Sequence, residues 1–388
     1  MIQFVAGNRI TLLSGGAEYF SALEEAIEGA TREIHLETYI FEYDETGKRI
    51  AGALRRAAAR GVAVYLLIDG FGSKDLPQSL HDALRADGVR VLVYRPVIWR
   101  WNRRRAQLRR LHRKLAVIDA NLAFVGGINI IDDTDTSDNT AARIDYAVRV
   151  EGPLVAGSVA AVKRLWRLVS WSHFKRRVGT PAWPQRVPAT RGDVRAAFVV
   201  RDNVRHRRAI ENAYLSAIEG ARSEIIIANA YFLPGIQFRN ALINAARRGV
   251  RVLLLLQGHV EYWLLHYASR ALYESFLDAG IEIHEITNGF LHAKVAVIDE
   301  HWCTVGSSNI DPFSLLLARE ANVVIEHRPI AVALKTGLAG VMENRARRVD
   351  AHHFTAQPWY TRFAPSISYA AVRLLMGILG YGRKHGYE

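Results

Sequence analysis

The chain carries the same polar pattern twice, and this repetition constrains the fold more than any other feature of the sequence. Residues 111–119 read Leu-His-Arg-Lys-Leu-Ala-Val-Ile-Asp, and residues 291–299 read Leu-His-Ala-Lys-Val-Ala-Val-Ile-Asp. A shared offset of 180 positions also carries Gly126 onto Gly306 and Asn129 onto Asn309. A repeat of this length indicates two copies of one structural unit.

The duplication extends upstream of the polar pattern. In each half an apolar stretch is followed by a helical pattern and a second apolar run that begins at Gly-Val. We expect strands at 33–39 and 61–69 around a helix at 50–60, and strands at 224–231 and 249–256 around a helix at 238–248. Apolar runs of this kind are typical of strands buried on both faces. The sequence therefore predicts an α/β fold with two homologous lobes, each a mixed β-sheet flanked by helices.

The predicted lobes cover residues 1–185 and 186–350. The segment 178–195 is rich in glycine and proline and is the expected seam between them. Residues 351–388 form a tail with an apolar helical pattern at 366–381, which fits a docked helix or a helix at a membrane interface.

The repeated pattern is His-x-Lys-x4-Asp followed by a glycine and an asparagine. Side chains two apart on a strand point to the same face, so His112 lies beside Lys114 and His292 beside Lys294. Gly126 and Gly306 are expected to let the backbone turn tightly before Asn129 and Asn309. Each copy thus supplies an imidazole, an ammonium group and a carboxamide.

This set of groups, present twice, suits displacement at a phosphodiester. The reaction needs a nucleophile, a proton donor for the leaving oxygen, and cations or amides around the phosphate oxygens. With lysines and Asn129 and Asn309 binding the phosphate, neither a metal nor a cofactor is called for. A single such pattern would more often be a polar decoration of a strand. Two complete copies, in which neighbours such as Arg113 and Ala293 differ, favour one shared active site on a pseudo-twofold axis.

Asp119 and Asp299 complete the motif and are counted here with its catalytic set. Their odd spacing from the histidines places them on the opposite face of the strand. The interpretation favoured by this spacing is that they brace the strand.

The formal net charge is +13, which favours anionic partners such as nucleic acid, an acidic membrane or a phosphate-bearing substrate. Arginine alternates with tryptophan in 95–110 and 166–177, a mixture that suits an anionic membrane interface, a single-stranded nucleic acid or a solvated basic face. We see no leader-like N-terminal segment and no apolar run long enough to span a bilayer.

The two motifs resemble the paired His-Lys-Asp motifs of the phospholipase D superfamily, and the similarity covers nearly the whole chain. The segments 231–235 (Tyr-Phe-Leu-Pro-Gly), 290–296, 306–312 (Gly-Ser-Ser-Asn-Ile-Asp-Pro) and 320–323 (Glu-Ala-Asn-Val) resemble the short bacterial cardiolipin synthases. The longer synthases begin with transmembrane helices, which are not seen in this chain.

The resemblance implies phosphatidyl transfer through a phosphohistidine. By analogy, His112 attacks phosphorus and His292 serves as acid and base. Relatives also hold each histidine with a carboxylate, and Glu320 in the second half and Asp145 in the first match that role. The implied partners are anionic phospholipids and a membrane surface, with no obligatory nucleic acid. The implied location is peripheral, on the cytoplasmic face of the cell membrane. The oligomeric state stays open.

Three functions remain in competition on sequence grounds. The favoured one joins phosphatidylglycerol to another phospholipid, in the manner of a cardiolipin synthase. A hydrolytic phospholipase D or a nuclease would use the same histidines. A basic membrane-binding protein without activity is the non-enzymatic alternative.

Overall fold

The computed structural model describes residues 2–96, 109–132, 141–172, 187–202, 206–258, 263–311 and 318–350. The predicted boundary at 185/186, the first half of the seam and the tail 351–388 lie outside these ranges. So do residues 97–108 and 173–177 of the two basic-aromatic segments. Among the described helices, none is long and apolar enough to cross a bilayer.

The first lobe is an α/β unit built on seven strands and a short eighth one. Its elements are β1 (Val5–Ser14), α1 (Gly15–Glu28), β2 (Glu33–Thr38), α2 (Glu45–Ala59), β3 (Ala63–Asp69), α3 (Gln78–Ala86), β4 (Arg90–Tyr94), β5 (Arg110–Leu111), β6 (Lys114–Ile118), β7 (Leu122–Gly126), β8 (Tyr146–Glu151) and α4 (Val155–Ser172).

The second lobe repeats this order and adds a strand at its end. Its elements are β9 (Val194–Arg201), α5 (Ala209–Gly220), β10 (Glu224–Asn229), α6 (Ile236–Arg247), β11 (Arg251–Gln257), α7 (Trp263–Arg270), α8 (Tyr273–Leu277), β12 (Glu282–Ile286), β13 (Lys294–Ile298), β14 (Trp302–Gly306), β15 (Ala318–Glu326), α10 (Arg328–Arg345) and β16 (Ala346–Arg348). The strands and helices expected from the sequence are confirmed. However, α2 begins at Glu45, before the predicted start at 50, because Asp44 caps its first turn through the amide of Gly47.

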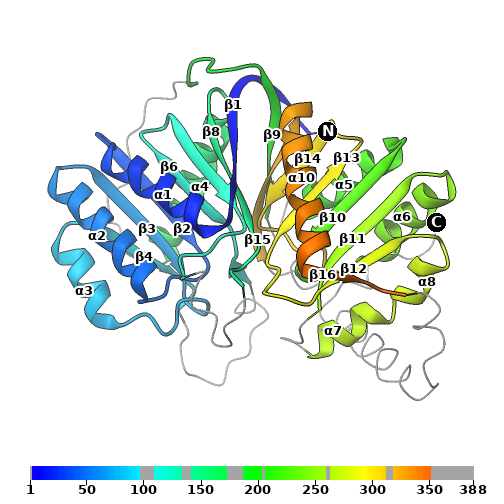
Figure 1. The fold of residues 1–388 in the computed structure, drawn as a ribbon. Helices are drawn as coiled ribbons and strands as arrows, with labels where there is room; N and C mark the ends of the chain where they lie inside the picture. The colour runs from blue at the N-terminus through cyan, green and yellow to red at the C-terminus, as the bar shows by residue number, and fades with distance from the viewer. Residues whose placement is uncertain are drawn as a thin grey trace.

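The order of the strands shows the duplication directly. It runs β16-β12-β11-β10-β13-β14-β15-β9-β1-β8-β7-β6-β2-β3-β4, so that, apart from β16, one lobe mirrors the other about the β9–β1 pair. Figure 1 shows the two halves of this continuous sheet splayed apart below the point where β1 and β9 meet. The start of β1 pairs with β9 at Val5 and Asn8, and its remainder pairs with β8. The predicted mixed sheets are confirmed, since β2–β3–β4 and β10–β11–β12 are parallel and the inner strands antiparallel.

A shared apolar core joins the lobes. One cluster of buried side chains contains Val125 and Val148 from the first lobe together with Val305 and Val323 from the second. Each lobe also has its own core under its outer helices. Because the central cluster would be exposed if the lobes separated, apolar burial fixes how the two copies face each other.

Parallel strands β2 and β3 end at the same side of the first sheet, and β10 and β11 end at the corresponding side of the second. We call this side, where each sheet also meets the start of β6 or β13, the carboxyl edge. The two motif segments enter their strands here, since β2 and β10 run antiparallel to β6 and β13.

Asp119 and Asp299 lie at the other end of these strands, in matching hairpin turns. Both have left-handed backbones (φ 50° and 51°), as do the residues that follow them. The Asp119 carboxylate accepts hydrogen bonds of 2.8–3.0 Å from the Thr31 amide and hydroxyl and from the Arg32 and Glu33 amides. The Asp299 carboxylate repeats this with the Arg222, Ser223 and Glu224 amides and the Ser223 hydroxyl. Each aspartate therefore ties its hairpin to the start of β2 or β10.

We expect Asp119→Ala and Asp299→Ala each to lower the free energy of unfolding by about 1–3 kcal/mol, because three backbone amides lose a charged acceptor and alanine is disfavoured at positive φ. Denaturant titration measures the loss. The Asp→Asn variants should lose less, since asparagine tolerates this backbone and keeps one acceptor oxygen. Unchanged stability together with lost turnover would instead make these residues catalytic.

Candidate active site

Each motif histidine is held by a carboxylate from the opposite lobe. The Nδ1 atom of His112 lies 3.0 Å from Oε1 of Glu320, and Nδ1 of His292 lies 2.6 Å from Oδ2 of Asp145. From their positions in the sequence, each carboxylate is expected to hold the histidine of its own half. The structure corrects this expectation, because each carboxylate holds the histidine of the other lobe and the pairs are crossed. All four side chains are largely buried. A hydrogen bond at Nδ1 leaves Nε2 as the ring atom available for reaction.

The backbone is crossed in the same way. The amide of His112 donates to the carbonyl of Arg319, and the amide of His292 donates to the carbonyl of Ile144. Each bond joins a histidine to the residue just before the carboxylate that holds its ring. Strand β5 also pairs in parallel with the start of β15, and Ile144 forms a bridge with Leu291. The histidines are thus fixed by both main chain and side chain across the lobe interface.

Both motif lysines lie buried beside the histidines. Strand β6 begins at Lys114 and β13 at Lys294, and each ammonium donates a hydrogen bond to the carbonyl of the histidine two residues earlier. Burial, together with the charge of Lys294, lowers the pKa of Lys114 to about 7. The effect of Lys294 on the pKa of Lys114 shows that lysines far apart in sequence share one electrostatic environment.

The pKa shifts of the two histidines also indicate that the imidazoles lie close enough to interact. Burial and Lys114 lower the pKa of His112, although Glu320 opposes them. Burial lowers the pKa of His292 well below its ordinary value, followed by the charges of Lys294, Lys114 and Arg143 and by His112 itself. In the absence of substrate, the neutral form of both rings is therefore favoured.

The two asparagines lie in loops that follow β7 and β14. The Oδ1 atom of Asn129 accepts a hydrogen bond from the Ile40 amide, which leaves its amide hydrogens for another acceptor. Asn309 is also buried, and its Oδ1 has no hydrogen-bond partner among the described residues. A phosphate role for these two side chains stays a prediction.

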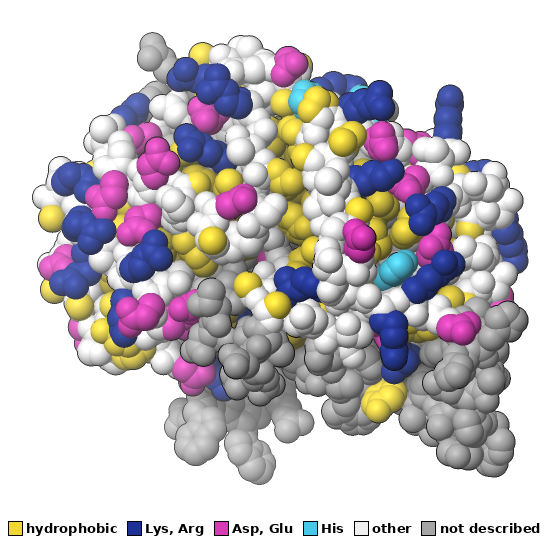
Figure 2. Space-filling model, in the orientation of Figure 1, with side chains coloured by type: hydrophobic (Ala, Val, Ile, Leu, Met, Phe, Trp, Pro, Cys, Tyr) yellow, Lys and Arg dark blue, Asp and Glu magenta, His cyan; other side chains and the backbone are white. Residues whose placement is uncertain are grey.

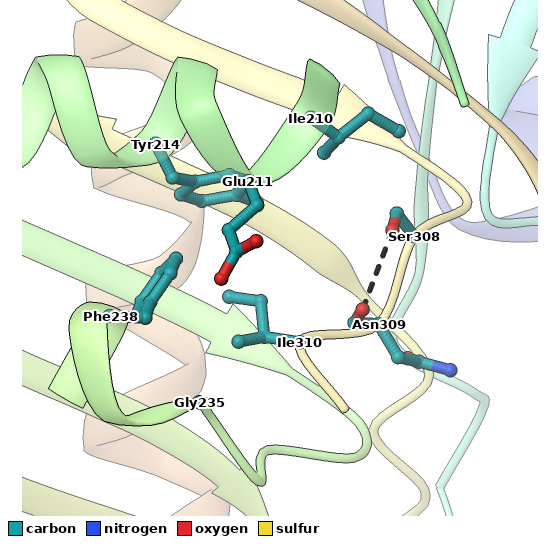
Figure 3. A pocket seen from close by; sticks show the side chains of 8 residues that line it. All are labelled: Ile210, Glu211, Tyr214, Gly235, Phe238, Ser308, Asn309 and Ile310. Carbon is teal, nitrogen blue, oxygen red and sulfur yellow. Dashed lines mark hydrogen bonds between the residues drawn. The ribbon is translucent and has the colours of Figure 1, made fainter. Parts of the chain in front are cut away.

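A small cavity lies behind Asn309 and is not the site of the chemistry. Its volume is about 10 Å³, which is room for about one water. Residues of α5, the start of α6 and the 308–310 loop line it. Figure 3 shows the Asn309 amide pointing away from the Glu211 carboxylate on the cavity's far side. A phosphodiester is too large for this space.

Gly126 and Gly306 serve a different purpose from the tight turn expected. They end β7 and β14 without positive φ. A Cβ atom would lie 2.6 Å from the carbonyl oxygen of Tyr146 at Gly126, and 2.6 Å from that of Ala321 at Gly306. The glycines therefore permit close approach of the strand that leads away from each carboxylate.

Asp119 and Asp299 do not belong to this catalytic set. Each follows a five-residue strand that begins at the motif lysine, and such a strand is about 16 Å long. Their carboxylates accept hydrogen bonds from the backbone amides at the starts of β2 and β10, as described above. The motif residues brought together at the carboxyl edge are the histidines and lysines.

Three further residues at the site were missed from the sequence. The ring of Tyr39 packs 4.8 Å from that of His112 and lies under the Lys114 ammonium. The hydroxyl of Ser307 donates to Oε2 of Glu320. Arg201 is fully buried at the end of β9, directly opposite Glu320 in the β9–β15 ladder. A charged residue ending an apolar strand was the available signal for Arg201, but its partner depends on strand register.

Comparison with known proteins agrees with this geometry. The family model described as "Cardiolipin synthase, PLD-like domain" matches residues 23–157 and 214–340, which contain the two copies. Cardiolipin synthase B of Escherichia coli K12 is 38% identical over 389 residues, covering 98% of this chain and 91% of that protein. A cardiolipin synthase of Geobacillus thermodenitrificans is 30% identical, covering 96% of this chain and 72% of that protein.

Among solved structures, the phosphatidylserine synthase of Haemophilus influenzae has the same fold. Its TM-score is 0.72 at 13% identity, with 97% of this chain and 95% of that chain covered. At this identity the likeness concerns the fold alone. Taken with the family model and the full-length relatives, the crossed two-motif site leads to one conclusion: the chain belongs to the cardiolipin synthase family of phospholipase D-like proteins.

Proposed function

We propose that the chain is a cardiolipin synthase, a phosphatidyltransferase that moves the phosphatidyl group of one phospholipid onto phosphatidylglycerol or a similar acceptor. It acts through a phosphohistidine and works as a peripheral protein on the cytoplasmic face of the membrane. The observation that carries the proposal is the crossed arrangement of His112 with Glu320 and His292 with Asp145. Full-length relatives that are cardiolipin synthases support the choice of reaction.

The crossed pairs determine which ring nitrogen of each imidazole can react. A carboxylate at Nδ1 holds the proton on that atom and leaves the Nε2 lone pair free for attack. In the first step Nε2 of His112 bonds to phosphorus, and the bond from phosphorus to the headgroup glycerol oxygen breaks. His292 donates its Nε2 proton to that oxygen, so that free glycerol leaves.

The second step reverses these roles. The hydroxyl of the acceptor phosphatidylglycerol gives its proton to His292 and its oxygen attacks phosphorus. The bond from phosphorus to His112 then breaks, giving cardiolipin and restoring both histidines. Each turnover consumes two phosphatidylglycerols and releases one glycerol, and His292 returns to its starting protonation state.

The buried cations supply the charge stabilisation. Lys114 and Lys294 lie on either side of the pseudo-twofold axis, where a phosphate between the histidines would contact both. The negative phosphodiester also counters the cations that lower the histidine pKa values, so substrate binding favours the protonated His292 that the first step requires.

Arg201 acts on the catalytic His112 through Glu320, the carboxylate that holds this histidine. Burial alone would raise the pKa of Glu320, but His112, Arg201 and Lys114 hold it below its ordinary value. The Nη2 atom of Arg201 donates to the Ala318 carbonyl, while its Nε and Nη1 have no hydrogen-bond partners among the described residues. A buried guanidinium so poorly hydrogen-bonded is costly, and its electrostatic interaction with the carboxylates of Glu320, Asp311 and Glu211 offsets part of this cost.

We expect His112→Ala and His292→Ala each to lower turnover by at least about 10³-fold, because one loses the nucleophile and the other the proton carrier of a single site. The assay follows glycerol and cardiolipin formed from phosphatidylglycerol vesicles. The wild-type protein should form them in a one-to-one ratio.

His301→Ala is the matched control, because His301 is an exposed histidine in the turn after β13. It should retain full turnover. Substantial activity in either motif variant would contradict the shared site. Phosphatidic acid as the only product would establish a hydrolase, and cleavage of single-stranded DNA without lipid turnover would establish a nuclease.

The low pKa of Lys114 predicts the alkaline limb of the pH profile. Since this pKa is about 7, the free enzyme loses the Lys114 charge as pH rises through that value. We expect kcat/KM for phosphatidylglycerol to fall above about pH 7, and kcat to fall only at higher pH because the bound phosphate stabilises the ammonium. Initial rates measured at each pH over a range of phosphatidylglycerol concentrations give the pH profiles of both kcat/KM and kcat. Lys114→Arg should move the kcat/KM limb upward, and a wild-type kcat/KM that stays level to about pH 9 would refute the assignment.

Arg201→Met should shift the acid limb. Without the guanidinium the pKa of Glu320 rises, so a higher pH is needed to ionise the carboxylate that holds His112. We expect about a tenfold to hundredfold lower kcat at neutral pH and partial recovery as pH increases. Arg195→Met is the matched control, because Arg195 faces Glu326 at the exposed end of the same ladder. A loss of kcat that is equal at every pH would make Arg201 merely structural.

A further inference from the structure

Large exposed apolar side chains are unevenly distributed over the molecule. Seven are found among the described residues: Tyr43, Phe71, Leu168, Trp171, Val187, Ile236 and Tyr267. Single exposed apolar residues are normal on any protein. What distinguishes these is their position, because all except Val187 lie at or beside the carboxyl edge.

Four of them follow the carboxyl ends of parallel strands. In the first lobe Tyr43 lies between β2 and α2, and Phe71 comes two residues after β3. In the second lobe Ile236 opens α6 after β10, and Tyr267 lies in α7 after β11. Figure 1 shows α7 at the lower edge of the molecule. Both lobes therefore present apolar side chains on the side where the active site lies.

The end of α4 adds two more. This helix starts after β8, at the opposite edge, and its last turns join a buried cluster with Tyr94 and Leu111 at the carboxyl edge. Trp166 belongs to that cluster, packing edge-on to Tyr65, so it is a core residue and not a membrane residue. Trp171, by contrast, is 74% exposed.

The exposed side of the last turns of α4 has a defined composition. Arg164, Arg167, Leu168 and Trp171 are all exposed, at the spacing i, i+3, i+4, i+7 of one helix face. Tryptophan suits the headgroup level of a bilayer, and arginine suits anionic headgroups. This face thus combines both features of a surface that rests on an anionic membrane.

The opposite edge has a different surface. Ion pairs join strand and helix ends there: Arg56 and Arg60 with Glu28, Arg251 with Glu224 and Glu282, Arg195 with Glu326, and Lys335 with Glu224 and Glu300. Figure 2 shows acidic and basic side chains interleaved over the visible face of both lobes. Paired charges of this kind are suited to water.

We infer that the carboxyl edge is the surface that contacts a bilayer containing anionic phospholipid, with the last turns of α4, the loops after β2, β3 and β10, and the Tyr267 side chain of α7 entering the headgroup layer. The inference rests on the proposed function. The pseudo-twofold axis passes between the lobes toward this edge, so equivalent loops lie at the same level and one flat surface touches both. Two lipids from one leaflet then reach the histidines from the same side.

The test is flotation of the full-length protein with vesicles of phosphatidylglycerol and phosphatidylcholine. Trp171→Ser/Ile236→Ser removes one apolar side chain from each lobe, and we expect vesicle affinity to fall about tenfold or more. Val187→Ser removes an exposed apolar side chain away from this edge and should bind like the wild type. Arg164→Gln/Arg167→Gln should weaken binding to phosphatidylglycerol vesicles and make it less sensitive to salt.

Equal vesicle binding by the wild type and the Trp171/Ile236 variant would overturn the inference, as would equal wild-type binding to vesicles of phosphatidylcholine alone. Turnover of a short-chain, water-soluble phosphatidylglycerol should be unchanged in the variant, which shows that its active site is intact. If that turnover falls as well, the arginine variant decides the question by the same vesicle assay. Vesicle binding that depends on these residues, without any cardiolipin formed by the wild type, would sustain the surface and reject the proposed function.

Discussion

The hydrogen bonds between each motif histidine and the carboxylate of the opposite lobe are the interactions on which the site depends. Neither lobe contains a complete histidine–carboxylate pair, so neither can orient its own imidazole. The main-chain bonds from His112 to Arg319 and from His292 to Ile144 impose the same requirement on the backbone. Apolar burial between the lobes therefore does more than stabilise the fold, because it also sets the positions of the reacting groups.

This arrangement has an electrostatic cost that the substrate relieves. Two lysines and an arginine are buried around the site, where burial and the charge of Lys294 both disfavour the charged form of Lys114. Burying charge without full compensation is unfavourable. A phosphodiester between the histidines would bring negative charge to this place, and the relief of part of this cost would contribute to the affinity for the substrate. The low pKa of Lys114 reflects this cost of burying positive charge.

Most of the fold and part of the site could be predicted from the sequence. The repeat offset identified two lobes, and the apolar runs identified their parallel strands because local pattern decides which segments become strands. The crossing of the carboxylates could not be predicted, since it depends on how the lobes pack and not on spacing within either one. Arg201 was missed for a related reason: its place opposite Glu320 follows from the β9–β15 register. The sequence showed that Gly126 and Gly306 matter, but only the neighbouring strands showed that close approach is the cause.

One pair of differing residues gains a meaning that the sequence alone did not supply. Gly127 and Ser307 occupy equivalent positions in the two copies but differ in side chain. At Gly127 a Cβ atom would lie 2.2 Å from the Asp145 carboxylate, whereas at the equivalent place Ser307 donates its hydroxyl to Glu320. Aspartate is one methylene shorter than glutamate, so its carboxylate lies closer to its own backbone and needs the space of glycine. The choice of carboxylate and the choice of its neighbour are therefore coupled in each lobe. As a result, the carboxylate that holds His292 at 2.6 Å also accepts a hydrogen bond from the Tyr146 amide, whereas the carboxylate that holds His112 accepts one from the Ser307 hydroxyl and lies close to the charge of Arg201. Two lobes of common design thus give their histidines different surroundings, as two different catalytic roles require.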